Sequence, residues 1–156
     1  MSSKSKLLAD LASEVDQGFI EDTFEVNGHS YKMRLLSDGE TNWKNRYVDA
    51  LSSALSMLSQ RKSATLAVAI RSIDGQSVES LYAPVVDVDL NEEDKKAAEK
   101  KVTDWTLLGK LERQFRVAAD VYDFLSARPE AFVTSLWEKF QELENRRDEV
   151  IKNLKK

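Results

Sequence analysis

Residues 23–35 read Thr-Phe-Glu-Val-Asn-Gly-His-Ser-Tyr-Lys-Met-Arg-Leu, and they decide the fold of the N-terminal half. Apolar and polar residues alternate on both sides of Asn27-Gly28, as in half-buried strands. Asn-Gly tolerates the positive φ angles of a type I′ turn. The stretch therefore predicts a β-hairpin with strands near 23–26 and 29–35. An isolated hairpin is only marginally stable, so other elements must cover its apolar face.

Helices are expected on both sides of this hairpin. Residues 5–16 carry apolar residues at helical spacing and predict a short amphipathic helix, which either folds onto the core or docks on a partner. After the hairpin, Ser37 or Asp38 can cap a helix from about residue 40 to 60. Its apolar stripe would cover the hairpin and comprises Trp43, Tyr47, Ala50, Leu51, Ala54, Leu55 and Leu58.

Residues 64–83 are ambiguous between helix and strand. Leu66, Val68 and Ile70 alternate, and Asp74-Gly75 suits a second hairpin turn. The alanines and the spacing of the apolar residues fit a helix equally well, and we favour a helix that ends near Asp74-Gly75. Pro84 then starts an extended connection to Leu90.

The second half is predicted to be helical. Asn91 can cap a helix that has three acidic residues in its first turn. A break is expected near Thr103-Asp104, and another at 126–129, before Pro129. The buried side of 91–126 is expected to hold Val102, Trp105, Leu108, Leu111, Phe115, Ala118, Tyr122 and Leu125, and the last helix has an apolar stripe of Phe132, Leu136, Phe140, Leu143, Val150 and Leu154.

These elements predict an α+β fold that is mostly α, with the hairpin packed on helices and long amphipathic helices at the C-terminus. We expect an α+β domain over 1–90 and a helical domain or helical hairpin over 91–156. The chain is 42% hydrophobic and 32% charged, which suits helices with one buried and one solvated face.

The composition narrows the classes of partner and chemistry that are open to this chain. The net charge of −4 disfavours non-specific binding to nucleic acid. With no cysteine, the chain cannot form disulfides, thiolate nucleophiles or cysteine zinc sites. No stretch approaches the roughly 18 apolar residues of a membrane span. We expect a protein of the cytosol in which it is made, without a nucleic-acid or membrane partner.

The usual signatures of enzymes are weak. His29 is the sole histidine, so a catalytic triad or a histidine metal site lacks its other members. Asp87, Asp89 and Asn91 have the spacing that opens a calcium loop, but Glu92 and Ala98 replace the required glycine and glutamate. No glycine-rich loop is present to hold phosphates. We therefore expect a protein that is not an enzyme and has no cofactor and no metal.

The last helix is the predicted binding element. Trp137 lies toward the edge of the Phe132–Phe140 stripe, and tryptophan at the margin of a helix is a common interface anchor. Packing inside the chain is the alternative, because apolar side chains on helices usually meet their own core. The predicted protein-binding residues are Phe132, Leu136, Trp137, Phe140 and Leu143.

The order of these features resembles the small tail assembly chaperones, and related baseplate or tail accessory proteins, of tailed bacteriophages. The resemblance covers residues 23–150. The order begins with the hairpin FEVNGHSYKMRLL, and three pieces carry the resemblance: an arginine or lysine before the segment TLAVAIRSIDG at 65–75, V-x-x-L at 78–81, and L-W-x-x-F-x-x-L at 136–143.

This resemblance implies a protein of the host cytoplasm that binds the tape-measure protein or other tail proteins during tail morphogenesis and keeps apolar helices soluble. A structural component of the tail or baseplate, retained in the virion, is the alternative. A composite enzyme completed by a partner, a cellular adaptor unrelated to phages and a homo-oligomer are also left open.

Overall fold

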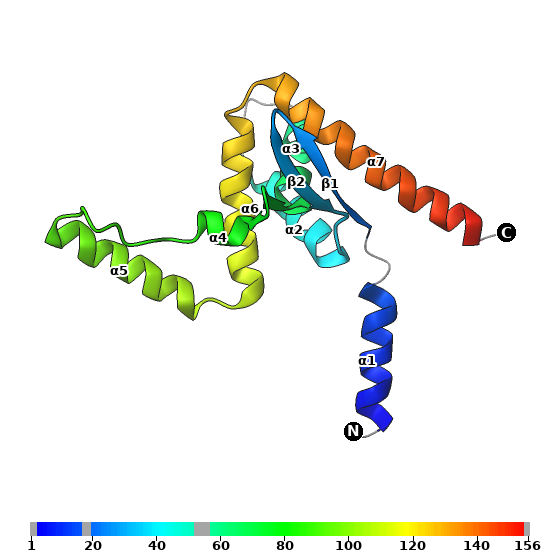
Figure 1. Cartoon of the computed structure of the whole chain (residues 1–156), viewed down its shortest axis with the longest axis horizontal. Coiled ribbons are helices and arrows are strands. Elements are labelled where there is room, and N and C mark those ends of the chain that lie inside the picture. The colour runs from blue at the N-terminus through cyan, green and yellow to red at the C-terminus, as the bar shows by residue number, and fades with distance from the viewer. Residues whose placement is uncertain (1–2, 17–19, 52–56, 155–156) are drawn as a thin grey trace.

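The computed structural model describes residues 3–16, 20–51 and 57–154 (Figure 1). Over these ranges the protein is mostly helical with one small antiparallel sheet, which confirms the predicted α+β class. In chain order the elements are α1 Ser3–Asp16, β1 Glu21–Val26, β2 His29–Arg34, α2 Asp38–Ala50, α3 Met57–Ala69, β3 Ile70–Ile73, β4 Gln76–Ser77, α4 Val78–Tyr82, α5 Glu92–Leu107, α6 Lys110–Ser126 and α7 Glu130–Leu154.

The predicted hairpin is confirmed. Strands β1 and β2 pair antiparallel, and the turn between them places Asn27 at φ 52° and Gly28 at φ 81°. Both angles lie in the left-handed region that a type I′ turn requires. Phe24 pairs with Tyr31, and both side chains are buried on the face that the helices cover.

Residues 64–83 contain both a helix and a second hairpin. The expected helix is correct only as far as Ala69, because β3 follows it and pairs with β2. Asp74 and Gly75 have φ angles of 52° and 80°. They form the second hairpin turn, which was the alternative to a continuous helix. Every residue over 63–70 is buried, so the segment shows no amphipathic period that would separate helix from strand.

The helices enclose the covered face of the sheet, whose strand order is β1-β2-β3-β4. α3 is central and packs against α2, α6 and α7, while α7 also crosses β1 and β2 (Figure 1). One hydrophobic core joins Phe24, Leu66, Val121 and Leu136. This core draws on residues from both sides of residue 90, because α6 and α7 pack on the same cluster as the hairpin.

Several predicted boundaries move. α2 ends at Ala50 and a new helix begins at Met57, so the single helix over 40–60 is not formed. Ala54 and Leu55 lie outside the described residues, and Leu58 is 78% exposed instead of covering the hairpin. Of the other members of the predicted stripe, Trp43, Tyr47 and Leu51 are half-buried and Ala50 is exposed.

The break between the two helices of the second half is also displaced. It falls at Leu108 and Gly109, not at Thr103-Asp104, because Leu108 leaves the helical region and Gly109 becomes the N-cap of α6. Leu111 then faces solvent with 63% of its surface exposed, against the expectation that it is buried. The predicted cap is confirmed, since the side chain of Asn91 accepts a 2.8 Å hydrogen bond from the amide of Asp94.

Candidate protein-binding surface

The five residues predicted to bind a partner share one face of α7, and that face is turned inward. Leu136 and Leu143 are fully buried and Phe140 is 4% exposed. Phe132 and Trp137 are half-buried and pack against the same core. In this conformation most of the predicted binding face is therefore occupied by the hairpin and α3, and a partner would have to displace α7 to reach it.

A different region projects from the core. The segment 83–108, here called the arm, consists of an extended connection followed by α5. Figure 1 shows the arm extending from the body beside α6, on the side away from the end of α7. α5 makes no extensive contact with any other described helix or strand, and none of its described side chains is fully buried. The arm therefore presents most of its surface to solvent.

Two adjoining hollows run along the arm, and together they are called the arm groove. The hollow at the base has a volume of about 490 Å³ and the outer one about 400 Å³. They share the lining residues Pro84 and Lys101. The base is lined by Tyr82, Pro84, Lys101, Asp104, Trp105, Arg116, Ala119 and Asp120, and the outer part by Pro84, Val85, Leu90, Asp94, Ala97, Ala98 and Lys101.

The base of the groove combines an aromatic floor with four charged side chains. Trp105 and Tyr82 are half-buried and pack on the edge of the core. Within the described ranges, no ion pair forms at Lys101, Asp104, Arg116 or Asp120. Partial burial, and then the neighbouring Asp123, raise the pKa of Asp120 above its usual value. A cation from a bound partner would stabilise the charged form of Asp120 against its burial and against the negative charge of Asp123.

Several apolar side chains of the arm are exposed, and one of them, Val85, lines the groove. Val85 is 69% exposed, Val88 93% and Leu107 79%. Leu111, at the start of α6, is exposed as well. A single exposed apolar residue is ordinary, but several on one projecting segment indicate an interaction surface.

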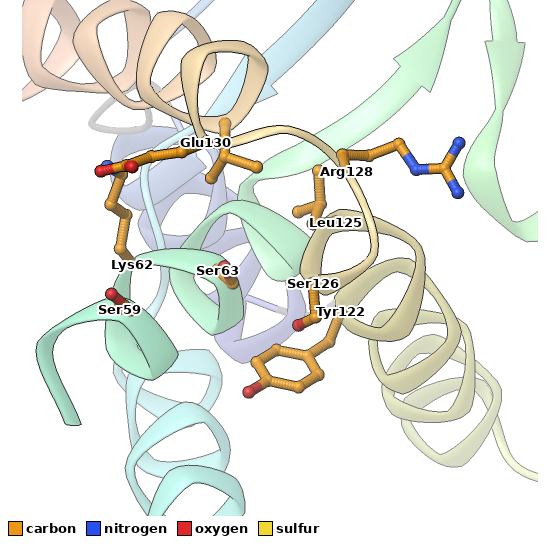
Figure 2. A pocket seen from close by; sticks show the side chains of 9 residues that line it. Ser59, Lys62, Ser63, Tyr122, Leu125, Ser126, Arg128 and Glu130 are labelled. Atoms are coloured by element: carbon orange, nitrogen blue, oxygen red, sulfur yellow. The ribbon is translucent and has the colours of Figure 1, made fainter. Parts of the chain in front are cut away.

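A further hollow of about 300 Å³ lies between α3, the end of α6 and the start of α7 (Figure 2). Its hydroxyl groups come from Ser59, Ser63, Tyr122 and Ser126. Among the residues that line it there is no histidine, cysteine or paired carboxylate to act as a base toward these hydroxyls. Figure 2 shows the guanidinium of Arg128 pointing away from the hollow, where it lies 4.6 Å from the ring centre of Phe124.

Glu40 forms the most buried charged cluster of the described chain, and its role is structural. Its carboxylate accepts hydrogen bonds from Arg71 and Gln114 and from the backbone amide of Ser37, the last at 2.8 Å. Burial raises its pKa, but the amide of Ser37 and the arginine lower it more, so the net shift is downward. The cluster fastens α2 to β3 and α6 and leaves the carboxylate fully engaged.

The sequence reasoning missed the arm because its signal is weak. Residues 85–90 were read as a connection, and α5 was expected to bury Val102 and Trp105 like an ordinary core helix. The informative signal was the apolar Val85-Val86 and Val88 after Pro84, in a segment too short and too acidic to supply a core strand. In the structure Val85 and Val88 are exposed, whereas Val86 is half-buried.

No protein-family model, curated protein or solved structure is found to match this chain. Over the described residues, no helix has the length and apolarity that crossing a bilayer requires. In the same part of the chain, no three acidic or histidine side chains are grouped so that they could hold a metal ion.

Proposed function

We propose that the protein is a tail assembly chaperone of a tailed bacteriophage, which binds an apolar helical segment of the tape-measure protein or another tail protein in the arm groove. The observation that carries this proposal is the groove itself, with its aromatic floor and its unpaired charges, on a projecting arm that exposes further apolar residues. The family resemblance supplies the identity of the partner.

The chemistry of the groove suits the binding of a helix. An amphipathic helix buries its apolar face in a groove and presents polar residues along the margins. Tryptophan, tyrosine and arginine are the residue types that most often dominate binding energy, and Trp105, Tyr82 and Arg116 lie together at the base. The charges beside them would set the orientation and register of the bound segment more than its affinity.

The arm is preferred to α7 as the binding element on energetic grounds. Exposing Leu136, Phe140 and Leu143 to a partner would first open the core, and each large apolar side chain contributes roughly 1.5–3 kcal/mol through its burial. A partner of the arm meets no such cost, because the arm surface is already solvated. Binding through Phe132, Leu136, Trp137, Phe140 and Leu143 would need a partner that replaces the hairpin.

The alternative is a structural component of the tail or baseplate, which would use the same arm in a permanent interface. Permanent interfaces are generally larger and more apolar than transient ones. The two functions differ in the fate of the protein. A chaperone is absent from purified particles, whereas a structural component is present in them at a fixed copy number.

Affinity capture from infected cells, followed by identification of the captured chains, tests the proposal. The full-length protein should retain a long, predominantly helical, tape-measure-like chain. Val85→Asp places a charge in the groove and should reduce this capture at least about tenfold, a loss of 1.4 kcal/mol. Leu58→Asp is the matched control, since Leu58 is an equally exposed apolar residue on α3 and lies outside the groove.

The proposal fails if the captured chain is not a tail protein, or if both variants retain it as the wild type does. Quantifying the protein in purified particles then separates the two functions. Absence favours the chaperone, and a constant ratio to a tail protein favours the structural component.

A further inference from the structure

Helix α1 is a second element that projects from the body (Figure 1). It shows no extensive contact with any other element that the structure describes. Leu7 and Leu8 are 58% and 59% exposed. In the sequence Leu11 and Val15 follow them at helical spacing and extend an apolar stripe, and its first two members, Leu7 and Leu8, are left uncovered by the described chain.

The charges of α1 oppose its formation in isolation. Lys4 and Lys6 are at its N-terminal end, and Asp10, Glu14 and Asp16 are toward its C-terminal end. A helix prefers the reverse, because its N-terminus carries partial positive charge and its C-terminus partial negative charge. A helix of 14 residues is also only marginally stable alone in water. A partner that supplies apolar contacts and complementary charges would stabilise it.

The arm groove supplies both. Its floor is formed by Trp105 and Tyr82, which can cover leucine side chains. Asp104 and Asp120 are available to the lysines of α1, and Lys101 and Arg116 to its carboxylates. The helix segregates its two kinds of charge, and the groove has both kinds without a partner in the described chain.

We propose that the arm groove binds α1 of a second copy of this chain, so that two copies exchange their N-terminal helices in a symmetric dimer. This rests on the arm groove being the protein-binding surface proposed above, and it adds a resting state in which that surface is shielded. Exchange of identical elements around a two-fold axis forms both contacts at once and closes the assembly. A tail-protein helix would then compete with α1 for the same groove.

Light scattering coupled to size exclusion tests the dimer on the full-length protein. At about 100 µM, where contacts of micromolar Kd are nearly saturated, the mass should be twice the 17.7 kDa of the monomer. The double variant Leu7→Asp, Leu8→Asp should elute as a monomer because its stripe is charged. The variant Trp105→Ala, Asp120→Lys should also be monomeric because its groove is altered, while Leu58→Asp should remain dimeric.

Mixing the two monomeric variants provides the decisive test. One has an intact groove and the other an intact α1, so the mixture should form a heterodimer held by one exchanged helix. A monomeric wild type would overturn the proposal, as would dimers of either variant or a mixture that stays monomeric. If α1 binds the groove of its own chain, the wild type remains at 17.7 kDa and the second copy is excluded.

The outcome can be separated from that of the proposed function. The Leu7→Asp, Leu8→Asp variant keeps the groove free, so it should capture the tail protein at least as well as the wild type. Failure of the dimer with capture intact would leave the proposed function standing. If capture is lost and the dimer persists, the helix exchange is supported and the proposed function is not.

Discussion

His29 Nδ1 lies 2.6 Å from Asp74 Oδ2, although 45 residues separate them in sequence. Asp74 Oδ1 also accepts a 2.8 Å hydrogen bond from the amide of Ser30, and the amide of Asp74 donates to the carbonyl of Ser30 at 2.7 Å. These contacts hold the Asp74-Gly75 turn beside the strand that follows Asn27-Gly28. They fix how β3 aligns with β2.

The stability of the protein should depend on pH through Asp74. The amide of Ser30, and then the side chain of His29, lower the pKa of Asp74 from its usual value of 3.8. Because the pKa is lower in the folded protein, this contribution is present above about pH 4 and is lost as the pH falls through the folded pKa. Asp74→Asn keeps a residue that tolerates positive φ but removes the charge.

Urea unfolding between pH 2.5 and 7 measures this contribution. We expect Asp74→Asn to be less stable than the wild type at neutral pH, with the two converging as the acid limit is approached. Asp87→Asn, on the exposed connection, serves as the control and should follow the wild-type curve. A constant difference between wild type and Asp74→Asn at all pH values would assign the effect to shape instead of charge.

Two glycine substitutions should have opposite effects. Gly75→Ala places a β-carbon at φ +80° and should destabilise the protein by about 1 kcal/mol. Gly39→Ala lies in the first turn of α2, where a β-carbon meets nothing within 4 Å, and should stabilise by about 0.5–1 kcal/mol. Thermal unfolding of both variants checks the pair, and equal shifts of Tm would contradict the turn conformation.

Removing the buried carboxylate should be costly. Glu40→Ala leaves Arg71 without its counter-ion and the backbone amide of Ser37 without its acceptor, so we expect a loss of about 3–5 kcal/mol in the free energy of unfolding. Glu40→Gln retains an acceptor for the amide of Ser37, so its free energy of unfolding should fall less than that of Glu40→Ala. Urea titration distinguishes them, and a loss under about 1 kcal/mol for Glu40→Ala would show that the cluster is not tightly buried.

α7 should behave as a core helix in its first half and as a solvated helix in its second. Leu136 is fully buried, so Leu136→Ala should lower the free energy of unfolding by about 2–5 kcal/mol. Val150 is 51% exposed on the same helix, so Val150→Ala should lower the free energy of unfolding by no more than about 0.5 kcal/mol. Similar losses for both would mean that α7 does not cover the sheet as described.

The elements with strong local signals could be predicted from the sequence. The Asn27-Gly28 hairpin, the Asn91 cap and the start of α7 after Pro129 each follow from a residue whose backbone preference is decisive. The segment 64–83 could not be resolved, because residues 63–70 are all buried and both periodicities fit the apolar residues there. Its strand forms only because β2 offers a free edge, and such a contact is absent from local sequence.

The binding surface was harder to predict, because periodicity cannot distinguish a face that meets the chain's own core from one that meets a partner. Leu136, Phe140 and Leu143 have an ideal spacing for either. The location of the groove depends on how Pro84 and Trp105 are brought together across the arm, which is a tertiary fact. Val88 and Leu107 are exposed because the core is filled by other residues, and local sequence does not show which apolar residues are left out.

The most direct test of the arm groove compares two tryptophans. Trp105 and Trp137 are both half-buried helical residues on the edge of the core, but only Trp105 lines the groove, while Trp137 belongs to the predicted face of α7. The affinity of each alanine variant for the captured tail protein should be measured, with circular dichroism as the check on folding. The arm groove predicts that Trp105→Ala raises Kd at least about tenfold and that Trp137→Ala changes it less than about twofold. The opposite order, in folded variants, would contradict the groove and return the binding site to α7.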